Sequence, residues 1–213
     1  MTTATIPDIA RSERRTQKAR REATRGALLA AAVDLVSRHG ANALRLHDVA
    51  DRAGVTKGAL QYHFALRADL AAAVTDHGWQ VLTAGLGAVD VSGSLQHRVD
   101  AAVDELWAAY SHPAAMAAFL ISSADIRGEK PDPRQLEVTL AARELMDQQW
   151  AALFDDAPVS PARGAAARRL LRAELVGLVS YPQAGHDSAK PTAELELLKE
   201  ALVHILSRAT AED

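Results

Sequence analysis

The chain has 213 residues, 48% of them hydrophobic, and is therefore long enough to fold around a sizeable core. It contains no cysteine, which excludes disulfide frameworks and thiolate metal sites, and it has neither a signal-peptide-like apolar stretch nor about 18 uninterrupted apolar residues. The net charge of −3 is unevenly divided, since residues 1–77 carry 12 Lys+Arg against 8 Asp+Glu and residues 78–213 carry 12 against 19. We expect a cytoplasmic protein with no membrane partner.

Residues 1–20 are predicted to form a basic N-terminal arm. The stretch 11–25 has seven basic side chains (Arg11, Arg14, Arg15, Lys18, Arg20, Arg21 and Arg25) and two acidic ones (Glu13 and Glu22). A basic arm on an acidic protein indicates a polyanionic partner at that end. A solvated tail would have the same composition, and charge alone does not separate these alternatives.

The rest of the chain is predicted to be all-α, because alanine and leucine dominate and no alternating strand pattern occurs. Breakers rich in glycine and proline divide it into about nine helices. The first three are expected at about 24–39, 46–53 and 56–63, and the helix-friendly basic stretch lets the first begin as early as Ser12. The others are expected at 67–88, 94–111, 113–127, 134–156, 162–184 and 191–210.

The segment between the second and third helices has the pattern of a helix-turn-helix. An apolar stripe at Leu46, Val49, Ala50 and Ala53 precedes Gly54, which can adopt a positive φ and turn the chain sharply. Thr56 is placed to cap the third helix, and Leu60 returns to the core. A small residue, a glycine and an apolar anchor in this order are typical of the motif.

The residues on the outward face of the third helix indicate the function of the motif. Burial of Val55, Ala59 and Leu60 leaves five residues outside: Thr56, Lys57, Gly58, Gln61 and Tyr62. Lysine donates to guanine O6 and N7, glutamine pairs with adenine N6 and N7, and a glycine allows close approach. Tyr62 and His63 can donate to phosphate oxygens. Helix-turn-helix corners also occur in proteins that bind no DNA, and Tyr62 or Phe64 would also fit as core aromatics. The basic arm favours DNA.

Residues 21–77 resemble the N-terminal domain of the TetR family of bacterial transcriptional regulators. The resemblance rests on "AAVDLVSRHG", "DVADRAGVTKGALQYHF" and "LRADL", which occur in the family's order and spacing. It implies an all-helical homodimer with a helix-turn-helix DNA-binding domain at 21–66 and a ligand-binding and dimerisation domain at 67–213. The N-terminal domains of such a dimer read a palindromic double-stranded operator, and the larger domains bind a small inducer.

Carried onto this chain, the resemblance implies base contacts by Thr56, Lys57, Gly58 and Gln61 and phosphate contacts by Tyr62, His63 and Arg67. Arg67 stands where the family usually has lysine. Arg45 departs further, because the family commonly caps the second helix there with Thr or Ser. An arginine cannot accept the capping hydrogen bond, so we expect a weak cap and a guanidinium that can reach a phosphate.

The larger domain holds seven of the nine aromatic residues, namely Trp79, Trp107, Tyr110, Phe119, Trp150, Phe154 and Tyr181. Core packing explains any one of them, but a pocket between helices would be lined from the same set. The candidate ligand-binding residues are Trp107, Tyr110, Met116, Phe119, Leu120, Met146, Gln149, Trp150 and Phe154. An apolar or aromatic inducer is the expected ligand.

The last two helices carry leucine stripes, at Leu171, Leu175 and Leu178 and at Leu195, Leu198, Leu202, Ile205 and Leu206. In the family, the equivalent helices pair with their symmetry mates, and Gly177 would allow a close approach. Periodicity alone fits packing within one subunit equally well, so the homodimer through 162–184 and 191–210 depends on the resemblance.

No enzyme is expected. Eight histidines show no metal-ligand spacing, no nucleotide-binding or hydrolase motif is present, and adjacent acidic pairs such as Asp104-Glu105 splay apart on a helix. No cofactor and no metal are expected. The interpretation is a dimeric, ligand-responsive transcriptional regulator, with repression the expected mode. The alternatives are a small-molecule-binding helical protein without DNA-binding activity and an enzyme acting in the aromatic cavity.

Overall fold

The computed structural model describes residues 6–128, 132–180 and 190–208, and the side chains of these residues apart from 6–16 and 124–128. Within these ranges the regular structure is entirely helical, which confirms the all-α prediction. The helices are α1 (Ile6–His39), η1 (Ala41–Ala43), α2 (Leu46–Ala53), α3 (Lys57–His63), α4 (Arg67–Gly87), α5 (Leu95–Ser111), α6 (Pro113–Gly128), α7 (Pro133–Leu153), α8 (Pro161–Ser180) and α9 (Thr192–Ser207). Residues 1–5 of the expected arm, Tyr181 with the rest of 181–184, and residues 209–210 lie outside the described residues.

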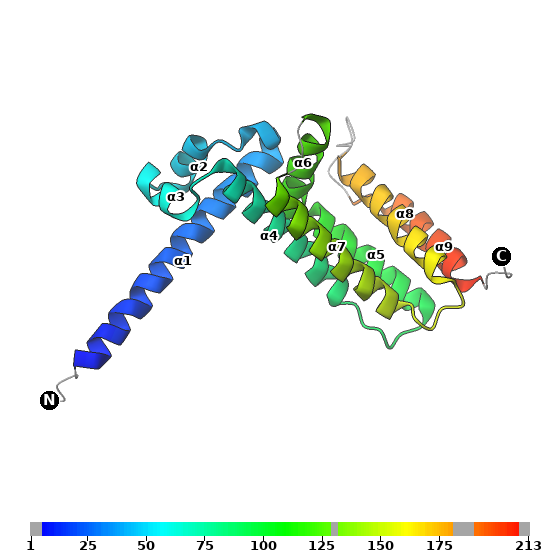
Figure 1. Ribbon diagram of the computed structural model, residues 1–213. Helices are drawn as coiled ribbons and strands as arrows, with labels where there is room; N and C mark the ends of the chain where they lie inside the picture. The colour runs from blue at the N-terminus through cyan, green and yellow to red at the C-terminus, as the bar shows by residue number, and fades with distance from the viewer. Residues whose placement is uncertain (1–5, 129–131, 181–189, 209–213) are drawn as a thin grey trace.

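The first helix is much longer than the sequence predicts. It begins at Ile6, before both Thr24 and Ser12, and runs unbroken to His39. No proline or glycine interrupts residues 8–25, and the alanines and arginines there are good helix formers, so nothing stops the helix. Residues 6–20 of the expected arm are therefore continuous with α1, which extends away from the rest of the molecule (Figure 1).

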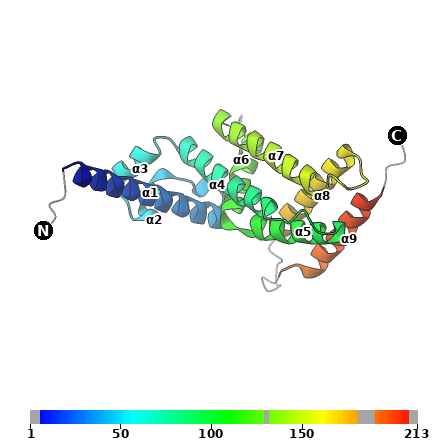
Figure 2. The ribbon, with the colours of Figure 1, turned by 90° about the horizontal axis from the view of Figure 1, so that it is seen from below.

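The molecule is elongated, with α1, α2 and α3 at one end and an antiparallel pair, α8 and α9, at the other (Figures 1 and 2). Two apolar cores fill it. The first joins α1, α2 and α3 to the start of α4 (Leu70, Ala71 and Val74) and to α6 (Ala114, Ala117 and Ile121). The second joins the end of α4 (Leu82 and Leu86) to α5, α7, α8 and α9. The cores thus divide within α4, after Val74, and not at the loop before Arg67.

Gly78 lies on α4 between the two cores, where α4 crosses α6 at the closest approach. A Cβ atom built on Gly78 would lie 2.5 Å from the Ala118 Cβ and 2.6 Å from the Ala114 carbonyl oxygen. No side chain fits there without separating the helices. Backbone contact at this point ties α4, which leads directly out of the helix-turn-helix, to the larger domain.

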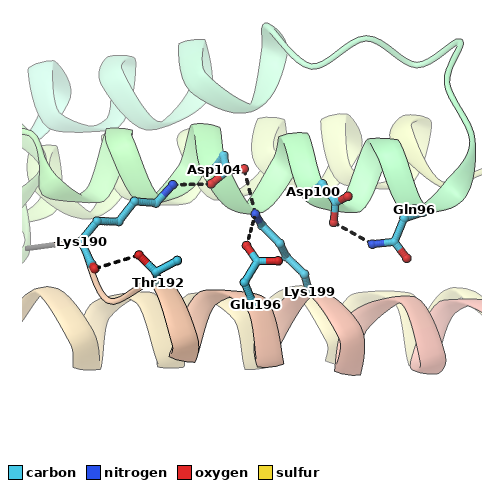
Figure 3. Close-up of polar contacts among 7 residues, drawn as sticks. All are labelled: Gln96, Asp100, Asp104, Lys190, Thr192, Glu196 and Lys199. Carbon is cyan, nitrogen blue, oxygen red and sulfur yellow. Dashed lines mark hydrogen bonds and ion pairs between the residues drawn. The ribbon is translucent and has the colours of Figure 1, made fainter.

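Charged residues join α9 to α5 (Figure 3). The Lys199 ammonium, whose side chain is almost buried, donates to Asp104 at 2.9 Å and to Glu196 at 2.8 Å, and Lys190 donates to Asp104 at 2.6 Å. Burial alone would raise the pKa of Asp104, but the hydrogen bonds and charges of Lys190 and Lys199 outweigh it and hold the pKa below its usual value. The layer of α5 and α9 is therefore internally charge-balanced.

The leucine stripes of the last two helices pack mostly within the same subunit. Leu171, Leu175, Leu195, Leu198, Leu202 and Leu206 are buried in the second core, whereas Leu178 and Ile205 lie at its margin. Most of the stripe therefore serves the fold of the single chain. A different set of small and apolar residues on α8 and α9 remains exposed.

Candidate nucleic-acid interface

The turn between α2 and α3 has the geometry that its sequence requires. Gly54 adopts φ 66° and ψ 31°, the left-handed conformation that ends α2 at little steric cost, and its N–H bonds to the carbonyls of Ala50 and Asp51. Thr56 then caps α3, because its hydroxyl oxygen accepts a hydrogen bond from the Ala59 N–H at 3.2 Å. Both local predictions are confirmed.

The inward-facing residues of the α2–α3 corner are buried in the first core. Val49, Ala50 and Leu60 are almost completely buried, and Val55 packs at the edge of the same core. Ala50 is small enough for α3 to cross α2 closely. A helix of only seven residues has little stability of its own, so this packing holds α3 in one orientation.

The opposite face of α3 is exposed to solvent. Thr56, Lys57, Gly58, Gln61 and Tyr62 are all exposed, with Tyr62 63% exposed. Lys57 and Gln61 lie one turn apart and border a groove of about 170 Å³ between α3 and α2. A Cβ atom at Gly58 would meet nothing within 4 Å, so no intramolecular contact explains the absence of a side chain there. The face presents a row of donors and no bulky apolar group before Tyr62.

Basic residues of α1 lie beside the end of α3. The Arg21 guanidinium lies 4.9 Å from the centre of the Tyr62 ring, and that of Arg25 lies 5.5 Å from the centre of the Phe64 ring. His63 is half-buried and packs edge-on against Tyr62 at 5.2 Å. Arg21 of α1 therefore adjoins the exposed face of α3 at Tyr62.

The two arginines expected at phosphates have different environments. Arg45 precedes α2 with its side chain exposed, and it makes no capping hydrogen bond, as predicted for a weak cap. Arg67 instead donates from Nε to the Leu44 carbonyl at 2.9 Å and from a terminal nitrogen to the Ala41 carbonyl at 3.2 Å. It thus joins the start of α4 to the turn that precedes α2.

The nine candidate ligand-binding residues do not line one cavity. Tyr110 and Phe119 line a cavity of about 40 Å³ between α4, α5, α6, α7 and α8. Trp150 and Phe154 line a cleft of about 570 Å³ beside the connection from α7 to α8, and Met116 borders a cleft of about 560 Å³ beside α1. The other four fill structural positions.

These four residues explain why a pattern of aromatic and apolar residues is a poor guide to a pocket. Trp107 and Met146 pack in the second core, and Leu120 packs against the first. Gln149 donates to the Thr83 carbonyl at 3.1 Å. Sequence reasoning included Trp79 only in the general set of aromatic residues and missed Arg143 and Arg172, and all three line the 40 Å³ cavity. A signal was present in the arginines at 168, 169 and 172 within an otherwise acidic half.

Residues 28–74 match the family model described as "Bacterial regulatory proteins, tetR family", which ends where the α4 residues of the first core end. The N-terminal domain belongs to the TetR family. Over most of its length the chain also has the fold of TetR regulators. It is similar to a transcriptional regulator from Rhodococcus sp. Rha1, at 20% identity over 85% of this chain and 95% of that one, with a TM-score of 0.70.

Two further structures are similar to this chain. The TetR-family transcriptional regulator PfmR from Thermus thermophilus is 16% identical over 87% of this chain and 96% of its own, with a TM-score of 0.64. The multidrug binding protein EbrR, in complex with imidazole, is 20% identical over 89% of this chain and 98% of its own, with a TM-score of 0.60. The TetR fold thus extends past the family-model match into the larger domain. No helix in the described ranges is long and apolar enough to cross a membrane.

Proposed function

We propose that the protein is a dimeric, ligand-responsive transcriptional regulator that reads a palindromic operator with α3. The observation that carries this proposal is the exposed face of α3, in which Lys57 and Gln61 present donors on a helix fixed by a buried underside. Lysine and glutamine donors suit the major-groove edges of guanine and adenine. The TetR-family match covers this motif.

Phosphate contacts would position that helix. Thr56, Tyr62 and Arg45 are exposed, as are Arg21 and Arg25 of α1. Hydroxyl and guanidinium contacts to phosphates fix the register on the duplex without reading sequence, and the guanidinium contacts make binding salt-dependent. Gly58 would let the start of α3 approach the groove closely.

A dimer is supported by a stripe left exposed on α8 and α9. On α8, Ala166, Leu170 and Ala173 are exposed, and Gly177 has open space where a side chain would be. On α9, Ala193, Leu197 and Ala201 are exposed at intervals of four residues, and Leu197 is 66% exposed. Small and apolar residues on two adjacent helices suit a four-helix interface with a second copy, which would give the operator its two-fold symmetry.

Regulation would act through α4. This helix leaves the DNA-binding domain at Arg67, contacts α6 at Gly78 and borders the 40 Å³ cavity with Trp79 and Leu82. A ligand in that cavity would move α4 and change the separation of the two α3 helices, which must match about one DNA turn, roughly 34 Å. Release of DNA by the ligand, with repression through blocked polymerase access, is the mode we propose. Such a protein acts in the cytoplasm and needs no catalytic activity.

Selection of bound DNA from a random pool, with the full chain as bait, tests the proposal. We expect an enriched inverted repeat whose half-sites change when Lys57 or Gln61 is replaced. Recovery of unrelated sequences without an inverted repeat would contradict operator recognition. A protein that bound small molecules but selected no DNA would be the binding protein without regulatory activity.

The interface has its own test. Leu170→Glu and Leu197→Glu should each produce monomers in sedimentation equilibrium, because a charge would be buried between the subunits. Leu145→Glu is the matched control, since Leu145 is 45% exposed on α7, outside the stripe. A dimer that survives both α8 and α9 substitutions would place the interface elsewhere.

A further inference from the structure

Three arginines from α7 and α8 gather beside one buried tyrosine. Arg168 and Arg172 lie one turn apart on α8, and Arg143 lies on α7. Tyr110 is 7% exposed, and Arg143, Arg172 and Tyr110 all line the 40 Å³ cavity. Burial raises the pKa of the Tyr110 hydroxyl, and the positive charges of Arg172, Arg168 and Arg143 act against that rise.

Two of the three positive charges of this cluster have no carboxylate partner among the described residues. Arg168 forms an ion pair with Asp147 on α7. Within the described ranges, no carboxylate lies within ion-pair distance of Arg143 or Arg172, and neither aspartate nor glutamate lines the cavity. Desolvation lowers the pKa of Arg143, and the charges of Arg172 and Arg168 lower it further. Like charges crowded beside a cavity destabilise one another, so an anion placed there would be stabilised.

Most of the remaining lining of the cavity is apolar. Trp79 and Leu82 come from α4, Phe119 from α6 and Val176 from α8. Ser122 and Thr139 add hydroxyl groups to the lining. A neutral apolar molecule would leave the guanidinium groups unpaired, and an inorganic anion would leave the apolar residues uncovered. The lining suits a ligand with both kinds of group.

We propose that this cavity binds a carboxylate carried on a short apolar body, an inference that rests on the proposed function because it takes the cavity to be the effector site. Arg143 and Arg172 donate to the carboxylate oxygens, and the Tyr110 hydroxyl donates to one of them. The apolar body lies against Trp79, Phe119 and Val176. A cavity of about 40 Å³ has room for about three waters, which matches a carboxylate group, so a longer body requires the helices to separate.

Butyrate, its neutral analogue butyramide and inorganic phosphate are the probes, used with the full chain at constant ionic strength. Butyrate should raise the melting temperature and give a measurable dissociation constant by calorimetry, whereas butyramide should do neither. Arg172→Gln and Arg143→Gln should each weaken butyrate binding about tenfold or more, because each removes a charge-assisted hydrogen bond. Arg163→Gln, an exposed arginine of α8 outside the cavity, is the control and should bind butyrate normally.

The unliganded variants give an independent readout. Arg172→Gln relieves like-charge repulsion and should melt at or above the temperature of the parent protein, so loss of butyrate binding is separated from misfolding. Equal responses to butyrate and butyramide, full butyrate binding by both arginine variants, or stronger stabilisation by phosphate than by butyrate would each overturn the assignment. If butyrate binds but no operator is selected, the proposed function fails; if an operator is selected but no carboxylate binds, only this inference fails.

Discussion

The α2–α3 corner and the α7–α8 pair use positive charge in opposite ways. At the corner, Lys57 and, on α1, Arg21 and Arg25 are exposed to solvent, where charges repel little and remain free for a large polyanion. Between α7 and α8, Arg143 and Arg172 line a small cavity and Arg168 lies one turn from Arg172, and partial removal from solvent strengthens their interaction with an anion there. The exposed basic residues at the corner are suited to a long, salt-sensitive contact with a polyanion. The arginines between α7 and α8 are suited to one small anion.

Disruption of the α4–α6 contact at Gly78, which connects the DNA-binding domain to the larger domain, should have the largest effect on stability. Gly78→Ala places a Cβ atom against Ala118 and the Ala114 backbone, so we expect the free energy of unfolding to fall by about 3 kcal/mol in urea titrations. Gly58→Ala is the matched control, because open space surrounds Gly58 and alanine favours a helix by about 1 kcal/mol. It should fold at least as well as the parent yet bind the operator more weakly. Unchanged operator affinity would show that Gly58 does not meet DNA.

Single substitutions on α3 test whether the exposed residues Lys57 and Gln61 contact DNA bases. Lys57→Ala and Gln61→Ala should each cost about 2 kcal/mol of operator affinity and relax the preference at one base pair, with unfolding unchanged. Gel shifts on operators altered at single positions measure this. Gln96→Ala, an exposed glutamine on α5, is the control. A uniform loss across all sequences would reassign both residues to phosphates.

The corner could be predicted from the sequence because its interactions are local. Gly54, Thr56 and Leu60 act within one or two helical turns, and their roles follow from φ preference, capping and spacing. The cavity could not be predicted, since Tyr110, Arg143 and Arg172 meet only after three helices pack. The leucine stripes of the last two helices left packing within one subunit and pairing with a second copy equally open for a related reason: a leucine repeat shows that a face is buried, but not by which chain.

Substitutions of Arg67 test whether this arginine both stabilises the fold and contacts DNA phosphates. Arg67→Ala should lower the free energy of unfolding by about 1 to 2 kcal/mol, because the carbonyls of Leu44 and Ala41 lose their donor, and should weaken DNA binding for every sequence. Arg67→Lys separates the roles. Lysine restores a phosphate contact but not the two-carbonyl bridge, so we expect stability to stay low. Full recovery of stability with lysine would contradict the bridging role.

In the α5–α9 layer, in contrast to the α7–α8 pair, the positive charges are paired with carboxylates. Variants of this layer should have the smallest effect on the free energy of unfolding. Asp104→Asn should lower the free energy of unfolding at neutral pH by about 1 kcal/mol, because Lys199 keeps only Glu196 as a partner. Asp100→Asn is the control, since among the described residues Asp100 accepts a side-chain hydrogen bond from Gln96 alone, on its own helix (Figure 3).

The pH dependence of that difference identifies its origin. The pKa of Asp104 is lowered by its lysines in the folded state, so its contribution is complete above the unfolded value of about 3.9 and is lost as the pH falls through the lower folded value. The pKa of Lys199 is raised, since Glu196 and Asp104 outweigh the opposing effect of burial, and its contribution is lost only as the pH rises above about 10.4. Urea titrations of Asp104→Asn and the parent chain should therefore differ between these limits and converge in acid. A difference that persisted below the folded pKa of Asp104 would assign the effect to packing instead of charge.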